Sequence, residues 1–198
     1  MKPKKALLAV DIQNDFCSGG ALGIPEGEKV IPALNKYIRL FSKKDLPVFA
    51  SRDWHPKKTG HFKKYGGVWP PHCIQNTKGS AFHPKLKLPK KAIMLYKGMD
   101  PKKDSYSVFQ ALDENDTRFM KIMKNMGIKE LYIGGLATDY CVKWTAQDAL
   151  RRDFKVKVLT DAVKGVDLKA GDSERAIKRI VKRGAKKTTF KKTSKSMG

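Results

Sequence analysis

The sequence has no long hydrophobic run and few cysteines, and these absences exclude several classes of protein. The first apolar stretch, Ala6–Val10, stops at Asp11 and is too short for the central region of a signal peptide. No other stretch approaches the length that a membrane-spanning helix needs. Cysteines are widely spaced without a Cys-x-x-Cys pair, which favours a reducing compartment; they are Cys17, Cys73 and Cys141. We therefore expect a cytoplasmic protein with no membrane partner.

Acidic residues are also scarce. The chain has 19 Asp and Glu against 42 Lys and Arg, a formal net charge of +23, and no acid follows Glu174. Such a surface could bind polyanions, so a basic nucleic-acid-binding protein is one alternative. However, no aromatic platform or known nucleic-acid-binding motif accompanies the lysines. We expect solvated surface charge and no specific nucleic-acid partner.

Predicted strands and helices alternate along the chain without an internal repeat. Apolar runs predict strands at residues 6–10, 46–51, 92–96, 131–133, 154–159 and 187–190. Helical spacing of apolar residues occurs at 30–41, at 117–126, after Cys141 and around 176–181. This alternation predicts a three-layer α/β/α fold with a central parallel sheet. We expect a single domain over residues 1–198, with a basic C-terminal tail at about 191–198.

Cys141 stands between a predicted strand and a predicted helix. Gly134 and Gly135 mark the end of the strand, and Thr138 and Asp139 can cap the helix that follows. A thiol at this place faces free backbone N–H groups and the positive end of the helix dipole, which favour the thiolate. Cys141 is therefore a candidate nucleophile, although a buried, inert cysteine is the alternative.

Two other predicted strands also end on ionisable side chains. Asp11 follows the strand at 6–10, and Lys97 follows the strand at 92–96. Ligands bind outside the carboxyl ends of the strands in an open parallel sheet. A carboxylate can move a proton, an ammonium group can hold a thiolate, and a thiolate can attack a carbonyl. Asp11, Lys97 and Cys141 together therefore indicate nucleophilic catalysis.

Three of the four histidines fall within a short segment beside a carboxylate. Asp53 and His55 follow the strand at 46–51, and His61 and His72 come soon after, in a long loop at 54–89. Imidazole and carboxylate together suit Zn²⁺, Fe²⁺ or Mn²⁺. Surface histidines in a lysine-rich loop are the alternative. His83 lies outside the cluster and is expected to be structural.

These blocks resemble the nicotinamidase/pyrazinamidase branch of the isochorismatase-like hydrolases. The resemblance covers Asp11-x-Gln-Asn-Asp-Phe16, Lys97-Gly98, Trp69-Pro-Pro-His72-Cys73 and Gly135-Leu-Ala-Thr-Asp-Tyr-Cys141-Val. It implies six strands in the order 3-2-1-4-5-6 and a catalytic triad of Asp11, Lys97 and Cys141. It also implies a cis peptide between Leu136 and Ala137, and an oxyanion hole formed by the N–H groups of Ala137 and Cys141.

The same resemblance implies the metal and the substrate. Asp53, His55 and His72 would be metal ligands, and His61 stands where only some members have a fourth histidine. The family's ring-binding aromatic positions match Phe16 and Trp69, and Tyr106 is a further candidate for that pocket. The implied function is a metal-containing cysteine amidohydrolase that converts nicotinamide to nicotinate and ammonia in NAD salvage and also accepts pyrazinamide.

Two questions stay open from the sequence. Another cysteine-dependent amidase of the same family, acting on ureido or carbamoyl amides, is the alternative enzyme, although the metal loop argues against it. Isochorismatases proper lack both the metal loop and the nucleophilic cysteine. The expected partner is a small amide substrate. No sequence feature locates an oligomer interface, so homo-oligomerisation stays open.

Overall fold

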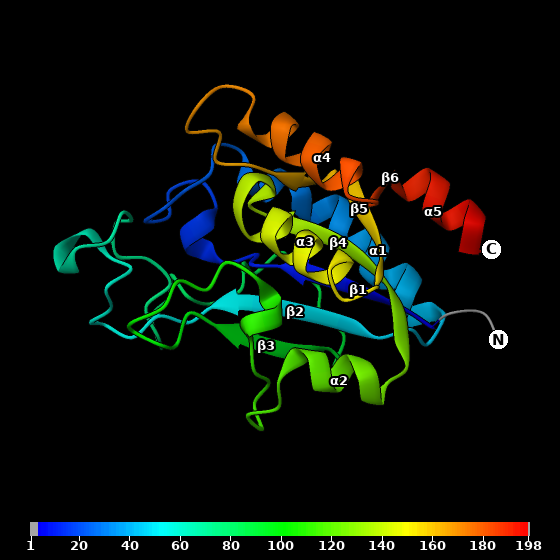
Figure 1. The fold of residues 1–198 in the computed structure, drawn as a ribbon, viewed down its shortest axis with the longest axis horizontal. Helices are drawn as coiled ribbons and strands as arrows, with labels where there is room; N and C mark the ends of the chain where they lie inside the picture. The colour runs from blue at the N-terminus through cyan, green and yellow to red at the C-terminus, as the bar shows by residue number, and fades with distance from the viewer. Residues whose placement is uncertain (1–3, 198) are drawn as a thin grey trace.

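The computed structural model describes residues 4–197 and arranges six parallel strands in one sheet (Figure 1). The spatial order is β3-β2-β1-β4-β5-β6, which confirms the predicted order. The strands are β1 Lys4–Val10, β2 Val48–Asp53, β3 Ile93–Lys97, β4 Ile128–Leu136, β5 Lys155–Lys164 and β6 Lys186–Thr188. The carboxyl ends of β1, β2 and β3 therefore lie side by side, at the end of the sheet from which the loop at 54–89 extends (Figure 1).

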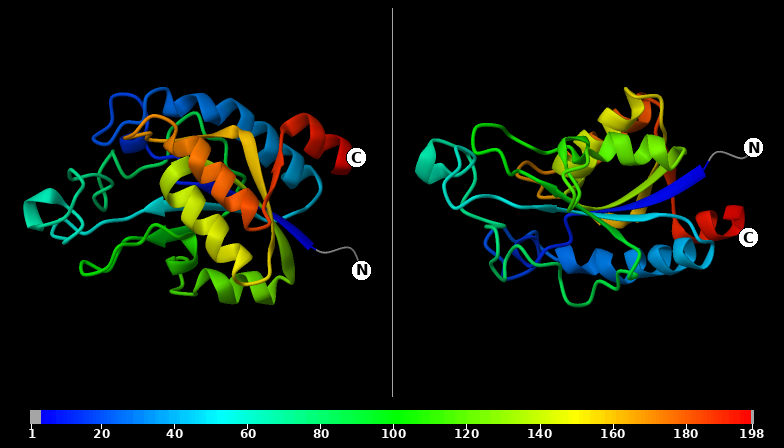
Figure 2. Two further views of the ribbon diagram at one scale, coloured as in Figure 1. Left: turned by 45° about the horizontal axis from the view of Figure 1, so that its top comes forward. Right: turned by 90° about the horizontal axis from the view of Figure 1, so that it is seen from below.

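Helices cover both faces of the sheet, as the two views of Figure 2 show. They are α1 Ile31–Lys43, α2 Phe119–Asn125, α3 Lys143–Leu150, α4 Asp172–Lys182 and α5 Phe190–Met197. Alternate residues of a strand point to opposite faces. Leu8 and Val10 of β1 accordingly pack into the core beneath α2, α3 and α4, whereas Leu7 and Ala9 pack into the core beneath α1 and α5.

The helix predicted at 30–41 is observed as α1. Pro32 lies in its first turn, where the missing N–H is not needed. Leu34, Tyr37, Ile38 and Phe41 are buried against the sheet, as their helical spacing predicts. None of the helices formed by residues 4–197 has the length and hydrophobicity to span a membrane.

The C-terminal segment differs from the prediction. The last strand ends at Thr188 and not at Phe190, and the expected tail forms α5, with Gly198 outside the described residues. The Phe190 N–H donates to Asp161 Oδ2 at 2.8 Å, which satisfies a free donor at the helix start. Its ring packs edge-on against Tyr37, with centroids 5.2 Å apart. These long-range contacts to β5 and α1 explain why a helix replaces the predicted strand end and tail.

Candidate active site

Cys141 lies in a single π-helical turn, Thr138–Val142, that joins β4 to α3. The peptide bond between Leu136 and Ala137, just before this turn, is cis, as the family resemblance implies. The predicted capping is wrong, since no side chain caps the turn. Asp139 instead accepts hydrogen bonds from the N–H groups of Val166 and Asp167, at 3.0 and 2.8 Å. Asp139 therefore ties the nucleophile turn to the loop that precedes α4.

Lys97 holds three acidic or nucleophilic groups together at the strand ends. Its Nζ lies 2.9 Å from Asp11 Oδ2 and 3.5 Å from Cys141 Sγ, and it also pairs with Asp53. Lys97 is 1% exposed and Asp11 is fully buried. The Ser51 hydroxyl donates to Asp11 Oδ1 at 2.7 Å, which fixes the orientation of that carboxylate. The structure thus brings together the three residues of the predicted triad.

The electrostatics of this cluster differ from the expectation. Burial raises the pKa of the Cys141 thiol well above its usual value, and the nearby Lys97 ammonium only partly opposes this. Burial likewise raises the pKa of Asp11, again with Lys97 opposing. Burial disfavours the charge of Lys97, but Asp11 and Asp53 hold its pKa well above the usual value. Burial and the helix dipole therefore act on the Cys141 thiol in opposite directions.

Three imidazoles form a second cluster beside the first. The ligand atoms of His55, His61 and His72 lie within 4.8 Å of one another, and all three side chains are buried. Asp53 Oδ2 lies 3.7 Å from His55 Nε2 and 4.0 Å from His72 Nε2. As predicted, His83 is outside this cluster, where its Nδ1 accepts from the Lys85 N–H at 3.2 Å.

Each imidazole is oriented by a hydrogen bond at its Nδ1. The partners are Gly98 O at 3.0 Å for His55, Pro70 O at 2.7 Å for His72, and Asp104 Oδ1 at 2.5 Å for His61. The buried Nε2 of His55 has no hydrogen-bond partner within residues 4–197. Metal-binding histidines typically donate one ring N–H to an oxygen and leave the other nitrogen for the metal. The four residues Asp53, His55, His61 and His72 therefore fit a divalent transition metal.

A cavity opens between the two clusters. Its wall includes the three predicted aromatic residues Phe16, Trp69 and Tyr106, together with Ala137 and Cys141 from the predicted oxyanion hole. Trp69 Nε1 donates to the Tyr106 hydroxyl at 2.8 Å, so these two side chains form one wall. On another wall, Phe16 packs against His72 with ring centroids 5.5 Å apart. The cavity thus places aromatic side chains close to the thiol.

Sequence reasoning missed several residues of this site. Tyr140 lines the cavity and packs edge-on against Trp69, and its only signal was its place beside Cys141. Gln13 is buried, donates to Asp53 O and accepts from Asp53 N–H, both at 2.8 Å. Gln13 lies within the Asp11–Phe16 block, but no sequence pattern indicates that its side chain bonds to the Asp53 backbone. Asp104 had no sequence signal, because it lies 43 residues from His61.

Comparison with known families identifies the family of this chain. Residues 5–192 match the family described as the isochorismatase domain. The chain belongs to the isochorismatase family. The nicotinamidase of Escherichia coli K12 is 40% identical over 199 aligned residues, which cover 92% of this chain and 93% of that protein.

Solved structures of family members agree with this assignment. The pyrazinamidase of Pyrococcus horikoshii, solved in complex with zinc, is 45% identical, with a TM-score of 0.87 over 95% of this chain and 100% of that one. PnC1 from L. infantum, solved in complex with nicotinate, is 26% identical, with a TM-score of 0.83 over 96% of this chain and 95% of the other. The fold of this chain is therefore that of the isochorismatase family.

Proposed function

We propose that this isochorismatase-family chain is a nicotinamidase that converts nicotinamide to nicotinate and ammonia, a step of NAD salvage, and also hydrolyses pyrazinamide. The observation that carries the proposal is the position of Lys97, which contacts both Asp11 and Cys141 beside a cavity that His61 and His72 line from another side. Its similarity to nicotinamidases and pyrazinamidases, one of them solved with zinc, supports the same substrate class.

In this proposal Cys141 is the nucleophile. Asp11 takes the thiol proton as Sγ attacks the carboxamide carbon, and Lys97 stabilises the resulting negative charge. The N–H groups of Ala137 and Cys141 stabilise the tetrahedral oxyanion, and losing one such donor typically costs about 3–4 kcal/mol. The C–N bond then breaks, and Asp11 returns the proton to the departing ammonia. Water hydrolyses the thioester and regenerates the thiol with release of nicotinate.

The ring of the substrate would be held by the opposite side of the cavity. Phe16, Trp69 and Tyr106 would pack against its faces and edge. A divalent metal, Zn²⁺, Fe²⁺ or Mn²⁺, would be held by the ligand set Asp53, His55, His61 and His72. When bound, the metal would supply a Lewis acid for the pyridine nitrogen, which orients the ring. We also place the enzyme in the cytoplasm, which the three unpaired cysteines favour.

The decisive test is ammonia release from nicotinamide by the purified protein. Turnover is expected with nicotinamide and pyrazinamide, and an N-carbamoyl amino acid should release no ammonia. Removal of metal by chelation should abolish turnover, and added Zn²⁺, Fe²⁺ or Mn²⁺ should restore it. Cys141→Ala is the matched inactive control. Absence of ammonia release from nicotinamide by metal-loaded protein would refute the proposal, and release from the N-carbamoyl substrate alone would assign the other amidase function.

A further inference from the structure

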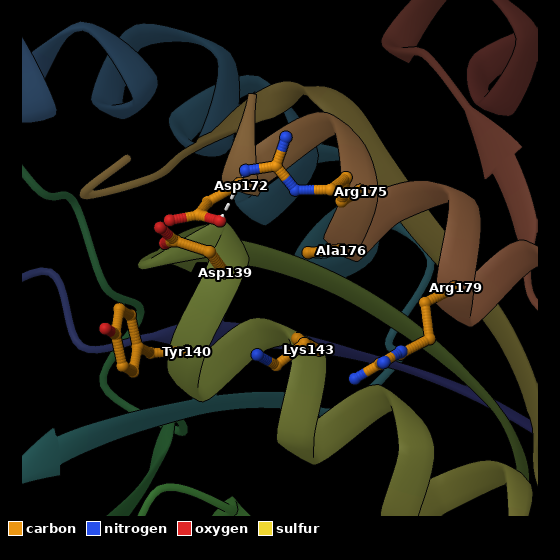
Figure 3. Close-up of a pocket in the computed structure, with 7 residues that line it drawn as sticks. All are labelled: Asp139, Tyr140, Lys143, Asp172, Arg175, Ala176 and Arg179. Atoms are coloured by element: carbon orange, nitrogen blue, oxygen red, sulfur yellow. Dashed lines mark hydrogen bonds and ion pairs between the residues drawn. The ribbon is translucent and has the colours of Figure 1, made fainter. Parts of the chain in front are cut away.

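A second cavity lies on the other side of the nucleophile turn, between that turn, α3 and α4 (Figure 3). It has a volume of about 320 Å³ and is open to solvent on one side. Three cationic and two acidic side chains surround it, with Tyr140 and Ala176 completing the wall; the charged residues are Lys143, Arg175, Arg179, Asp139 and Asp172. This cavity is outside the site described above, although Tyr140 lines both.

Both carboxylates at this cavity already have partners. Asp139 accepts from two backbone N–H groups, those of Val166 and Asp167. Asp172 Oδ1 accepts from Arg175 at 2.7 Å, the contact dashed in Figure 3, and its Oδ2 accepts from the Lys169 N–H at 3.0 Å. These hydrogen bonds orient both carboxylates, and Arg175 balances the charge of Asp172, whereas Asp139 keeps its negative charge beside Lys143.

Lys143 and Arg179 are the two cations of this cavity that make no direct ion pair. Neither makes an ion pair with a carboxylate among residues 4–197. Both side chains line the cavity; in Figure 3 Arg179 extends from α4 toward α3, and Lys143 extends from α3 toward the side of Tyr140. Lys143 is partly buried, and this burial, together with the charge of Arg179, lowers its pKa, although Asp139 and Asp172 oppose the shift. Two like charges converge on one cavity, an arrangement that a bound anion would stabilise.

We propose that this cavity binds a phosphate group, either inorganic phosphate or the phosphoryl group of a small metabolite. Arg179 has a planar guanidinium that can donate two parallel hydrogen bonds to phosphate oxygens. Lys143 supplies a second, compact positive charge from the facing helix. A phosphate dianion matches two cations better than a carboxylate does, because it carries two negative charges and has more acceptor oxygens.

The same cavity is linked to the substrate pocket through Tyr140. Lys143 Nζ lies 5.6 Å from the centre of the Tyr140 ring, within the range of a cation–π contact. That ring lies 5.0 Å from Trp69 and 5.7 Å from Tyr106, both of which line the pocket of the active site. A phosphate that draws Lys143 away from Tyr140 would therefore alter the packing of the pocket wall. This coupling rests on the proposed function, whereas phosphate binding itself does not.

Calorimetric titration of the metal-loaded protein with inorganic phosphate tests the site. Ionic strength is held constant with chloride, and a parallel titration uses ribose 5-phosphate. One saturable site is expected, with affinity reduced at least ~10-fold in Arg179→Gln and in Lys143→Gln, because each removes a charge-assisted contact. The control Lys192→Gln removes one exposed charge from α5 and should bind phosphate as the parent protein does.

The outcomes separate the site from diffuse charge and from the metal. No saturable binding, or equal weakening in Lys192→Gln, would overturn the proposal in favour of general polyanion attraction. Binding that survives Arg179→Gln and Lys143→Gln would place phosphate elsewhere, for example on the metal, and would also overturn it. Tighter binding of ribose 5-phosphate would identify a phosphorylated metabolite as the ligand, and tighter binding of inorganic phosphate would identify the free anion.

Kinetics test the coupling to the active site separately. Phosphate is expected to change the KM for nicotinamide in the parent protein and to leave it unchanged in Arg179→Gln, whose basal turnover should be normal. An identical response in both proteins would overturn the coupling while the binding site stands. If nicotinamide is not hydrolysed at all, the proposed function fails, and the calorimetric result still decides the phosphate site.

Discussion

The two halves of the active site are built by different means. The nucleophile half rests on the sheet, where Asp11 follows β1 directly, Lys97 ends β3, and Cys141 follows β4. The metal half consists of the ligand set Asp53, His55, His61 and His72. Most of it belongs to the loop at 54–89, where His61 and His72 lie outside any strand. Strand ladders position the first half, whereas single hydrogen bonds to ring nitrogens orient the second. The positions of the metal ligands should therefore be more sensitive to substitutions of neighbouring residues than the position of the triad.

Asp53 connects the two halves. It ends β2, pairs in register with Lys97, and also makes an ion pair with the Lys97 ammonium. Its other carboxylate oxygen faces His55 and His72. Burial tends to raise the pKa of Asp53, but Lys97 and the histidines hold it far below the usual range. The same carboxylate thus stabilises the catalytic lysine and forms part of the metal site.

The largest expected effects fall on the nucleophile half. Cys141→Ala should reduce nicotinamide turnover by at least ~10³-fold, because the triad acts as a unit. The free energy of unfolding of Cys141→Ala should change little.

Lys97→Met should abolish turnover as well. It should also destabilise the protein by about 3–5 kcal/mol, because it leaves the buried Asp11 and Asp53 carboxylates unpaired. Steady-state kinetics and urea denaturation measure the two effects.

These two variants separate catalysis from stability. Equal stability of Lys97→Met and the parent protein would show that the ion pairs around Lys97 contribute nothing to folding. Residual turnover in Cys141→Ala at more than a few per cent would remove Cys141 from the role of nucleophile.

The next effect concerns Gly98, where the two halves touch. Gly98 has φ of +75°, and a Cβ there would lie 2.6 Å from His55 Cε1. Gly98→Ala should therefore displace His55 and weaken metal retention by roughly 10–100-fold, the usual cost of losing a partner of a metal ligand. Metal content after dialysis measures this effect. Gly66→Ala is the matched control, with φ of +94° and no atom within 4 Å of the added Cβ. Equal metal loss in both variants would point to backbone strain alone.

A smaller effect is expected at Asp104, which contacts the metal site from the surface. Its carboxylate accepts from His61 Nδ1 and so presents the other ring nitrogen to the metal. Asp104→Asn should weaken metal retention by about 10-fold, with activity recovered by excess metal. His61→Ala should have a stronger effect of the same kind, and His72→Ala should empty the site.

Asp100→Asn supplies the control for Asp104. Asp100 is an exposed carboxylate nearby that pairs with Lys103 and not with a histidine. Unchanged metal content in Asp104→Asn would show that the negative charge of Asp104 is not needed to hold His61. Full metal occupancy and normal turnover in His72→Ala would contradict the metal assignment itself.

The smallest effect on catalysis is expected in α5, far from both halves. Phe190→Ala removes the edge-on contact with Tyr37 and should destabilise the protein by about 1–3 kcal/mol, because the ring is only partly buried. Nicotinamide turnover per folded molecule should not change. Lys191→Gln should alter neither quantity, since its side chain is exposed. A loss of turnover in Phe190→Ala with folding intact would connect α5 to the active site.

The sequence by itself determined which positions carry the catalytic and metal-binding side chains. The sequence could predict strands that lead into Asp11, Lys97 and Cys141, and a histidine-rich loop after Asp53, because each depends on neighbouring residues. The sheet order and the ligand set followed from resemblance to a family. These predictions needed only local pattern and precedent, and the structure brings the named residues together.

Tertiary structure alone decided what depends on segments distant in the chain. Asp104 bonds to His61 across a separation of 43 residues. Asp161 and Tyr37 contact Phe190 at the start of α5, where the sequence predicts a strand end and a tail. The local helix dipole favours the thiolate of Cys141, whereas burial of the whole site raises its pKa and favours the thiol, an effect that the sequence did not indicate. Desolvation depends on every group packed around an atom, and no stretch of neighbouring residues contains that information.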